Sequence, residues 1–233
     1  MKRIASVSGG KDSTAMLILL YEQGVNLDYI VFMNTGLEFP QTVRFVHEKL
    51  SPWCKEHFGK EVTFIYPKRP FGYYFKKYGV PYYPRGRWCC RVLKKDTFYY
   101  WVMSSVEDKD IALYVGYSAD EKRRFEKALK ETNKYWSKRR KNITLVAPLI
   151  DLGITESKAL EICKKHDLLN PLYKHFNRTG CWLCPFQSID SWRVLHDYYP
   201  HLWKAAVKIE SLSIKLGKKT FRPEGPLPFI LGL

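Results

Sequence analysis

Residues 6–17, SVSGGKDSTAML, decide how this chain begins to fold. The apolar run before the glycines, RIASV at residues 3–7, predicts a strand. The run DSTAMLILLYEQG at residues 12–24 predicts a helix that begins at polar capping residues and ends at a glycine. Between them, Gly9 and Gly10 let the backbone turn tightly and bring its amide groups close to an anion. The stretch therefore predicts a phosphate-binding turn between a strand and a helix.

The side chains of this turn suit the same chemistry. Lys11 supplies a point charge, and the hydroxyl groups of Ser8 and Ser13 can donate hydrogen bonds to phosphate oxygens. The start of the following helix adds a partial positive charge aimed at the same place. The order of residues differs from the G-x-x-x-x-G-K-[ST] loop of common NTPases, because here the two glycines directly precede the lysine.

Further along the chain, apolar runs alternate with helical patterns. The strand-like runs are LDYIVFMNTG at 27–36, EVTFIYP at 61–67, DIALYVGYS at 110–118 and NITLVAPLI at 142–150, and helical spacing occurs at 42–58, where Pro52 could kink or split the helix, and at 155–168. This alternation predicts an α/β fold, a Rossmann-like doubly wound parallel sheet. Residues 68–109 are aromatic and irregular and predict no definite element. We expect residues 1–176 to form a nucleotide-binding α/β domain, and residues 177–233 to form a small C-terminal helical and cysteine segment packed on it.

Composition limits the class of protein. Of the 233 residues, 45% are hydrophobic and 27% are charged, which is ordinary for a soluble globular protein. No apolar run approaches the roughly 18 residues that span a bilayer, and the first motif follows Met1 too closely for a signal peptide, so we expect a cytoplasmic protein without a membrane partner. The net charge of +16 indicates an anionic partner such as a nucleotide, a sulfate or phosphate substrate or a nucleic acid, unless the surplus lysine serves only solubility.

Two cysteine pairs stand out. Cys89 and Cys90 are adjacent, and a single peptide link strains a disulfide between neighbours. Cys181 and Cys184 have the Cys-x-x-Cys spacing that lets two thiolates converge on one metal centre. Alone, this spacing also suits redox dithiol chemistry or core packing, but the companion pair favours a metal held by four thiolates. Zinc is the generic metal for such a set, although its sites usually use two Cys-x₂₋₄-Cys hairpins.

The other cysteines and the histidines predict no site. Cys54 and Cys163 lie on the apolar faces of predicted helices, so we expect both to be buried structural residues. The six histidines show no spacing typical of metal ligands.

Several motifs together resemble one superfamily, that of the PP-loop ATP pyrophosphatases and the phosphoadenylyl-sulfate and adenylyl-sulfate reductases. SGGKDS resembles the PP-loop, FMNTGLEFPQT at 32–42 is similar to the segment of the second strand beside the adenine nucleotide, and VGYSADEKRR at 115–124 resembles a Gly-x-x-x-Asp-Glu segment followed by arginines. Residues 147–184 closely resemble the reductase branch, with Leu152 where that family usually has Trp.

The resemblance implies site residues. Nucleotide binding falls on Ser8, Gly9, Gly10, Lys11, Asp12, Ser13, Asn34, Thr35, Gly36, Glu38 and Gly116. Contact with a substrate anion falls on Asp120, Glu121, Arg123, Arg124 and Arg91. The catalytic residues are Lys11, which with the loop amides would stabilise a pentacovalent phosphorus, and Asp12, which would help hold Mg²⁺.

The resemblance also favours a cluster over zinc. Adenylyl-sulfate reductases bind a [4Fe–4S] cluster through Cys-Cys plus Cys-x-x-Cys, and WCCRVLKK at 88–95 resembles their Cys-Cys-x-x-x-Lys stretch. We therefore expect Cys89, Cys90, Cys181 and Cys184 to bind such a cluster. The nearby cations would favour thiolates and attract an anionic substrate, unless they form only a solvated basic face; they are Arg85, Arg87, Arg91, Lys94 and Lys95.

One family motif is missing from this sequence. Sulfonucleotide reductases carry a catalytic cysteine in a Glu-Cys-Gly-(Leu/Ile)-His motif, whereas no cysteine follows Cys184 here. PP-loop enzymes as a class transfer AMP from ATP to a substrate oxygen and release pyrophosphate, and sulfur-inserting members then displace the AMP. We therefore expect ATP-dependent sulfur transfer (thiolation), with a sulfur donor and a tRNA or DNA acceptor as partners. The alternatives are reduction of adenylyl sulfate or phosphoadenylyl sulfate by an external thiol, such as a thioredoxin-like protein, and a non-catalytic nucleotide-binding Fe–S module.

The segment from Lys122 to Lys141 holds ten Lys/Arg and two Glu. Its cations are interleaved with Phe125, Tyr135 and Trp136, which suits a nucleic-acid backbone with stacked bases. An exposed helix with a charged outer face explains the same pattern.

Overall fold

The computed structural model describes residues 1–84, 87–137 and 139–233, which form two compact units. Unit 1 comprises Met1–Met33, Pro40–Ile65 and Trp101–Tyr173, and unit 2 comprises Asn34–Phe39, Tyr66–Tyr100 and Lys174–Leu233. The last segment of unit 2 begins three residues before the domain boundary expected after residue 176, and that boundary stays a prediction. Arg85, and Lys138 of the basic segment, lie outside the described residues.

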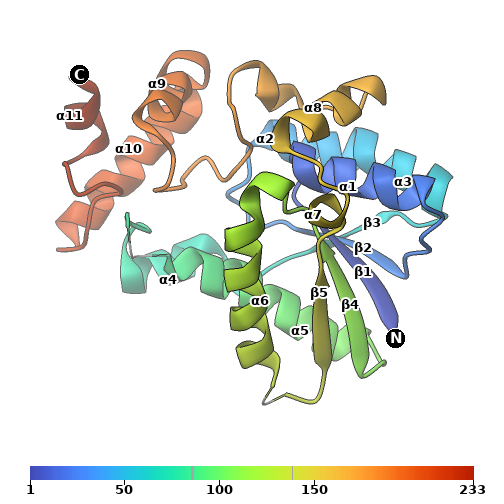
Figure 1. Ribbon diagram of the computed structural model, residues 1–233. Coiled ribbons are helices and arrows are strands. Elements are labelled where there is room, and N and C mark those ends of the chain that lie inside the picture. The colour runs from blue at the N-terminus through green and yellow to red at the C-terminus, as the bar shows by residue number, and fades with distance from the viewer. Residues whose placement is uncertain (85–86, 138) are drawn as a thin grey trace. The chain divides into compact units, whose positions relative to one another are not determined.

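Unit 1 is built on a five-stranded parallel sheet in the order β3-β2-β1-β4-β5 (Figure 1). The strands are β1 (Lys2–Val7), β2 (Tyr29–Met33), β3 (Val62–Ile65), β4 (Asp110–Val115) and β5 (Asn142–Val146). β1 pairs in parallel with β2 on one side and with β4 on the other. The strand order therefore reverses at β1, and ligands of such sheets bind outside the carboxyl ends of the strands at this point. The predicted fold is confirmed.

Helices follow the strands of unit 1. They are α1 (Lys11–Glu22), α2 (Pro40–Phe45), α3 (Ser51–Phe58), α6 (Lys122–Trp136), α7 (Pro148–Asp151) and α8 (Glu156–Lys165), with single turns at Val46–Leu50, Ala119–Glu121 and Pro171–Lys174; α5 (Asp96–Ser105) begins in unit 2 and ends in unit 1. From β1 the chain passes through α1 to β2 on one side of the sheet, and from β4 it passes through α6 to β5 on the other side. Because such crossovers are right-handed, α1 and α6 lie on opposite faces of the sheet.

The core of unit 1 lies between the sheet and α1, α3 and α8. It includes fully buried residues of β1 and α1, such as Ala5 and Leu17, together with Cys54 and Cys163. Both thiols have 0% exposure, which confirms the expected burial, and this burial raises the pKa of each to about 12. These two cysteines are therefore unreactive core residues.

Three local expectations need correction or completion. The run at 142–150 is a strand only to Val146, because Pro148 starts α7. The helical pattern at 42–58 is present without a break: the backbone is helical on both sides of Pro52, which closely follows the wide turn at Val46–Leu50. The region 68–109, which predicted no definite element, contains α4 (Phe71–Tyr78), a wide helical turn at Cys90–Lys95, α5 and the loop that leads to β4.

Unit 2 is mainly helical. Besides α4 it contains α9 (Ile189–Tyr198), α10 (Pro200–Lys215) and α11 (Leu227–Leu231). Trp192 of α9 and Phe221 are fully buried, with ring centres 5.5 Å apart. Glu210 of α10, 1% exposed, accepts hydrogen bonds from the backbone N–H groups of Phe221 (3.0 Å) and Leu227 (2.6 Å). This carboxylate therefore ties the C-terminal tail to α10.

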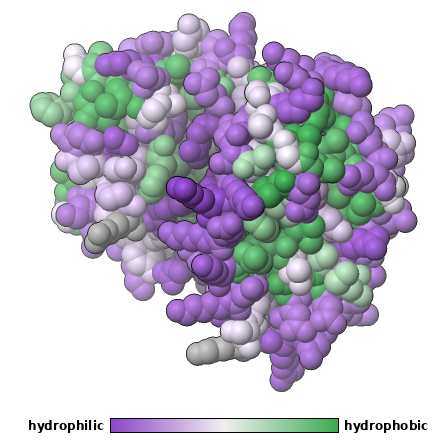
Figure 2. Space-filling model, viewed as in Figure 1, coloured by the Kyte–Doolittle hydropathy of each residue, from purple (hydrophilic) through white to green (hydrophobic). Residues whose placement is uncertain are grey.

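Hydrophilic side chains cover much of the face drawn in Figure 2, with smaller apolar areas between them. Among the described residues, no helix is both long enough and apolar enough to cross a bilayer.

Candidate phosphate and thiolate sites

The glycine turn between β1 and α1 requires its first glycine. Gly9 has a φ of +70°, which L side chains rarely adopt. A Cβ atom there would also lie 2.9 Å from the Cγ2 atoms of both Thr42 and Val46. The side-chain amide of Asn170 donates a 2.8 Å hydrogen bond to the Gly9 carbonyl oxygen, which fixes the turn from the other side. The backbone of this turn is thus packed into one conformation.

Both predicted serines lie inside the turn and hold its shape. The backbone N–H of Ser8 donates to Ser13 Oγ (3.1 Å), and Ser13 Oγ in turn donates to the carbonyl oxygen of Gly10 (3.1 Å). The two hydroxyl oxygens lie 3.2 Å apart. Ser8 and Ser13 therefore order the loop, and their expected contact with phosphate stays a prediction.

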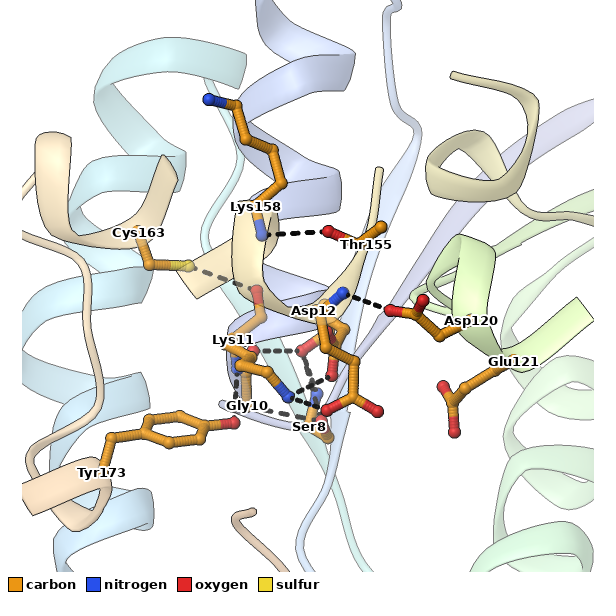
Figure 3. A network of polar contacts seen from close by, with 12 residues as sticks. Ser8, Gly10, Lys11, Asp12, Asp120, Glu121, Thr155, Lys158, Cys163 and Tyr173 are labelled. Carbon is orange, nitrogen blue, oxygen red and sulfur yellow. Dashed lines mark hydrogen bonds and ion pairs between the residues drawn. The ribbon is translucent and has the colours of Figure 1, made fainter. Parts of the chain in front are cut away.

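Lys11 is buried at the first position of α1, with 7% of its side chain exposed, and Figure 3 shows it within a network of polar contacts that includes Asp12 and Tyr173. Its Nζ lies 2.7 Å from Glu156 Oε2 and 3.3 Å from Asp12 Oδ2. Burial alone lowers the pKa of Lys11, but the hydrogen bond to Glu156 and the charge of Asp12 outweigh it, so the net pKa is raised. The ammonium group is therefore fully charged at neutral pH. The backbone N–H of Lys11 donates to the Tyr173 hydroxyl at 2.8 Å.

Residue patterns alone did not single out Glu156 or Tyr173 as site residues. Both fall in residues 147–184, the stretch that resembles the reductase branch, and that resemblance was the available signal. Their contacts with Lys11 join segments more than 140 residues apart, and no spacing rule predicts such a contact.

Asp12 offers a free oxygen atom. Its Oδ1 is buried and has no hydrogen-bond partner in the described part of the chain, while Oδ2 faces Lys11. Burial raises the pKa of Asp12 despite the opposing charge of Lys11, and the charges of Glu156 and Glu121 raise it further. A buried, unpartnered carboxylate oxygen with acidic neighbours fits a hard cation such as Mg²⁺.

The end of β4 closes on the same loop. A Cβ atom on Gly116 would lie 2.6 Å from the backbone nitrogen of Ser13 and 2.7 Å from its Cα, so only glycine allows this approach. The carboxylate of Asp120 accepts a 2.8 Å hydrogen bond from the backbone N–H of Glu156 and so fixes the start of α8. Glu121 pairs with Arg124, whose guanidinium lies 5.2 Å from the Tyr117 ring.

These contacts bear on the residues expected to contact a substrate anion. Asp120, Glu121 and Arg124 contact other parts of unit 1, whereas Arg123 is exposed, and the expected contacts stay predictions. Arg91 belongs to unit 2 and is also exposed.

The segment from Asn34 to Glu38 belongs to unit 2 and is ordered by its own hydrogen bonds. Glu38 accepts from the backbone N–H of Thr35 (2.8 Å) and from its hydroxyl, and Asn34 Oδ1 accepts from the Gly36 N–H (3.0 Å). Gly36 has a φ of +79°. Glu38 is buried and forms an antiparallel bridge with Cys181. The expected position of this segment beside adenosine stays a prediction.

Unit 2 holds all four predicted cysteine ligands. Cys89 and Cys90 precede and begin the wide turn before α5, and Cys181 and Cys184 lie in a tight turn closed by a 3.1 Å hydrogen bond between their backbones. The four thiols lie within electrostatic range of one another, since the charges of Cys90, Cys181 and Cys184 all raise the pKa of Cys89. Folding therefore brings pairs 91 residues apart into one neighbourhood.

The four thiols have different surroundings, which shift the pKa values of Cys90 and Cys181 in opposite directions. A hydrogen bond from Cys89 and the positive charge of Arg87, whose Nη2 lies 3.4 Å from Cys90 Sγ, lower the pKa of Cys90 to about 5. Burial raises the pKa of Cys181 to about 12, and its thiol donates to Glu38 Oε1 at 3.6 Å. Lys94 Nζ lies 3.7 Å from the same oxygen. These surroundings thus favour the thiolate at Cys90 and the protonated thiol at Cys181.

Four cysteine thiols are the type of ligand that an iron–sulfur cluster requires. Thiolates are the usual ligands of such clusters, and Arg87 and Lys94 favour the deprotonated state. Within the described part of the chain, no three His, Cys, Asp or Glu side chains are arranged around one point as ligands of a metal ion.

The basic segment 122–141 is largely α6. Trp136, expected as a stacking platform, is 6% exposed and is therefore unavailable for stacking. Lys141 is buried, and its ammonium group donates to the carbonyl oxygens of Glu107 (2.8 Å) and Asp108 (2.9 Å). Trp136 and Lys141 therefore serve the fold of unit 1.

A parallel sheet in this strand order, with a glycine turn and a buried lysine after its first strand, defines a doubly wound α/β protein with a phosphate-loop type of turn. The chain belongs to the phosphoadenosine phosphosulfate reductase domain family, whose model matches residues 2–187.

Relatives by sequence include two uncharacterised proteins of Methanocaldococcus jannaschii. MJ0066 is 28% identical over 207 residues, which cover 86% of this chain and 40% of the relative, and MJ0973 is 28% identical over 208 residues, which cover 88% and 46%. This chain thus spans less than half the length of these two relatives.

Two solved structures are similar to the chain. A phosphoadenylyl-sulfate reductase from Candida auris, in a phosphate complex, aligns with a TM-score of 0.50 and 11% identity over 78% of this chain and 82% of that chain. This likeness supports the fold. The U34-tRNA thiolase NcsA from Methanococcus maripaludis, with its [4Fe-4S] cluster, aligns with a TM-score of 0.49 and 17% identity over 95% of this chain and 74% of that chain. At that TM-score the resemblance does not establish a common fold.

Proposed function

We propose that the protein is an enzyme that binds ATP at the glycine turn, transfers AMP to an oxygen atom of an acceptor, and supports replacement of that oxygen by sulfur. The observation that carries the proposal is the gathering in unit 2 of four thiols in a chain whose unit 1 has the phosphate turn. A nucleotide-binding module without a metal centre would not need these thiols.

The proposed reaction has two steps and requires a sulfur donor. The acceptor oxygen attacks the α-phosphorus of ATP, the bond to the β-phosphate oxygen breaks, and pyrophosphate leaves. Inorganic sulfide or a persulfide then attacks the carbon that bears the adenylated oxygen, and AMP leaves with that oxygen. A persulfide donor additionally requires two electrons from an external thiol, whereas sulfide requires none.

Residues of unit 1 would carry the first step. Lys11 would exchange its contact with Glu156 for a phosphate oxygen, and the backbone amides at the start of α1 would bind the same group. Asp12 would hold Mg²⁺ through its unpartnered oxygen, and the ion would neutralise charge on the polyphosphate.

Residues of unit 2 would hold the cluster. Cys89, Cys90, Cys181 and Cys184 are its proposed ligands, with zinc as the alternative metal. Bound there through all four thiolates, a [4Fe–4S] cluster would supply electron transfer, and it would offer a binding position for sulfide only where one of the four cysteines did not ligate its iron. Arg87 and Lys94 would keep the thiols deprotonated as ligands.

A single anaerobic assay tests the proposal. Protein purified without oxygen is offered ATP, adenylyl sulfate and phosphoadenylyl sulfate in separate reactions, each with sulfide, an external thiol and bulk tRNA or DNA as the acceptor, and pyrophosphate and sulfite are measured. We expect pyrophosphate from ATP and its loss in Lys11→Ala. Sulfite release from either sulfonucleotide would instead support a reductase that uses an external thiol, and loss of both activities in protein with its metal restored would support a non-catalytic module.

Metal analysis tests the cluster separately. We expect iron and sulfide in the anaerobic protein, and their loss when Cys181 and Cys184 are both changed to Ser. The matched control changes the buried Cys54 to Ala, which should leave the iron content unchanged. Colourless protein that holds one zinc ion would contradict the cluster.

A further inference from the structure

Residues 66–95 of unit 2 have an unusual composition. They contain nine Lys/Arg, nine aromatic residues and no Asp or Glu. In the structure part of this stretch forms α4. We use the name tyrosine–lysine surface for six exposed residues of this stretch and the adjoining α5; they are Lys68, Arg69, Tyr73, Lys76, Lys77 and Tyr100.

Contacts between rings and cations connect this surface. Lys68 Nζ lies 4.2 Å from the ring centre of Tyr100, and the guanidinium of Arg69 lies 5.3 Å from the ring centre of Tyr73. Tyr74 lies near three of these residues, because the charges of Tyr73, Tyr100 and Arg69 all act on its pKa. The two cation–ring pairs therefore belong to one continuous area, with Asp96, which also acts on Tyr74, as its acidic neighbour.

The surface is open to solvent and its charge is not neutralised. Tyr73 is 57% exposed and Tyr100 is 47% exposed. Across residues 1–84, 87–137 and 139–233, no acidic side chain forms an ion pair with any of its four cations. Each exposed ring thus lies beside a cation whose charge is free to meet an external anion.

The basic helix α6 differs from this surface both in the pairing of its charges and in the exposure of its rings. Glu121 pairs with Arg124 there, Trp136 is buried, and Phe125 packs against Tyr117 with ring centres 5.6 Å apart. The helix therefore presents cations interspersed with carboxylates and fewer rings for stacking.

We propose that the tyrosine–lysine surface binds a single-stranded segment of nucleic acid. Its phosphates would meet Lys68, Arg69, Lys76 and Lys77, and two bases would stack on Tyr73 and Tyr100. The bases must be unpaired, because only then are their faces accessible to rings on a protein surface. The inference deepens the proposed function by locating a binding surface for its acceptor, and it rests on that proposal only for the acceptor's role in the reaction.

The chemistry of the rings favours nucleic acid over an anionic membrane. The exposed rings of this surface are tyrosines, whose hydroxyl groups remain in water, whereas insertion into a membrane surface relies on Trp, Phe and Leu. Stacking on bases needs only a flat ring beside a cation.

Fluorescence anisotropy with labelled oligonucleotides tests the proposal. Single-stranded RNA, single-stranded DNA and a duplex of the same sequence are titrated with the full chain at several salt concentrations. We expect the single strands to bind more tightly than the duplex, and comparison of RNA with DNA tells which sugar is preferred. In Lys76→Gln/Lys77→Gln the slope of log affinity against log salt should fall by about 1.4 for two lost phosphate contacts.

Ring variants and a matched helix control complete the test. Tyr73→Ala and Tyr100→Ala should each weaken single-strand binding about tenfold, and Tyr73→Phe should restore it, because phenylalanine keeps the stacking face. The control Lys127→Gln/Lys130→Gln makes the same charge change on α6. Because these lysines would not contact the phosphates, it should alter the affinity less than twofold.

The outcomes separate this inference from the proposed function. ATP binding measured by isothermal titration needs no acceptor and should be equal in all these variants, so absence of ATP binding in every protein would count against the proposed function alone. Equal loss of binding in the α6 control, stronger binding to the duplex, or binding to phosphatidylserine vesicles in a parallel titration with none to the single strands would overturn the tyrosine–lysine surface as a nucleic-acid site.

Discussion

Lys11 Nζ lies 2.7 Å from Glu156 Oε2, and this ion pair joins the first turn of α1 to the first turn of α8 across 145 residues. Lys11 is 7% exposed and Glu156 is 49% exposed, so the carboxylate stands on the solvent side of the ammonium group. A phosphate that approaches Lys11 must therefore displace this carboxylate or bind beside it. The pair explains how a lysine can be buried in the loop without leaving its charge unpaired.

Replacing Glu156 by Gln should tighten nucleotide binding. The change removes a negative charge from the place where phosphate binds but keeps an oxygen that can accept from Lys11. A unit charge about 6 Å from a phosphate contributes roughly 1–2 kcal/mol at a partly screened site, so we expect the Kd for ATP to fall about tenfold. Isothermal titration at two salt concentrations measures the change and its screening.

The variant Glu156→Ala distinguishes two roles of Glu156, competition with phosphate for Lys11 and orientation of Lys11. If Glu156 only competes with phosphate, Glu156→Ala should bind ATP as tightly as Glu156→Gln. Weaker binding in both variants would show that the carboxylate orients Lys11 for the phosphate, which would contradict the expected competition.

Replacing Gly116 by Ala should disrupt the loop. The new Cβ atom would lie 2.6 Å from the backbone nitrogen of Ser13, and backbone atoms at the start of α1 cannot move aside cheaply. Overpacking of this kind costs about 1–3 kcal/mol, so we expect a lower urea midpoint and weaker ATP binding together. The matched control is Gly72→Ala, where a Cβ meets nothing within 4 Å, and this change in α4 should leave both quantities unchanged or slightly improved. Normal ATP binding in Gly116→Ala would contradict the close approach.

Cys90 in metal-free protein should react with iodoacetamide at mildly acidic pH. Its pKa is lowered to about 5, so the thiolate persists at pH values where an ordinary thiol is protonated, and its alkylation rate should fall only as the pH approaches about 5. In Arg87→Gln the pKa should rise, and reactivity should be lost at a higher pH. Peptide mass spectrometry follows each cysteine, with the buried Cys54 and Cys163 as unreactive internal controls. A Cys90 that reacts only above pH 8 would contradict the role of Arg87.

Local sequence patterns predicted the sheet because each strand of unit 1 is a short apolar run and each long connection is helical. The turn at Gly9 and Gly10 and the burial of Cys54 and Cys163 followed from the same local chemistry. Residues 68–109 were not placed, because aromatic residues occur in strands and helices alike and no clear period distinguishes the two here.

The contacts of the candidate site were less predictable. The ion pair of Lys11 with Glu156 and the hydrogen bond of Lys11 with Tyr173 depend on how distant segments meet in the folded chain. The hydrogen bonds that Glu38 accepts from Thr35 and Cys181 were also not predicted, and its expected contact with a nucleotide stays a prediction. Spacing along the chain carries no information about such contacts.

Glu210 should make the stability of unit 2 depend on pH in a specific direction. Burial raises its pKa above the ordinary value of 4.5, although the N–H groups of Phe221 and Leu227 act against this rise. The unfolded chain therefore releases this proton at a lower pH than the folded chain does. Its contribution to the free energy of unfolding is fully present below the unfolded pKa, falls as pH rises from there through the folded pKa, and then stays constant.

The test compares urea midpoints of the natural protein and Glu210→Gln from pH 4 to pH 8. The glutamine variant should be less stable throughout, because its side chain has one acceptor oxygen for two backbone donors. Since other groups titrate equally in both proteins, the difference between them isolates Glu210, and we expect the advantage of the natural protein to shrink as pH rises. An advantage that grows with pH would show that the two N–H donors outweigh burial and lower the pKa of this carboxylate.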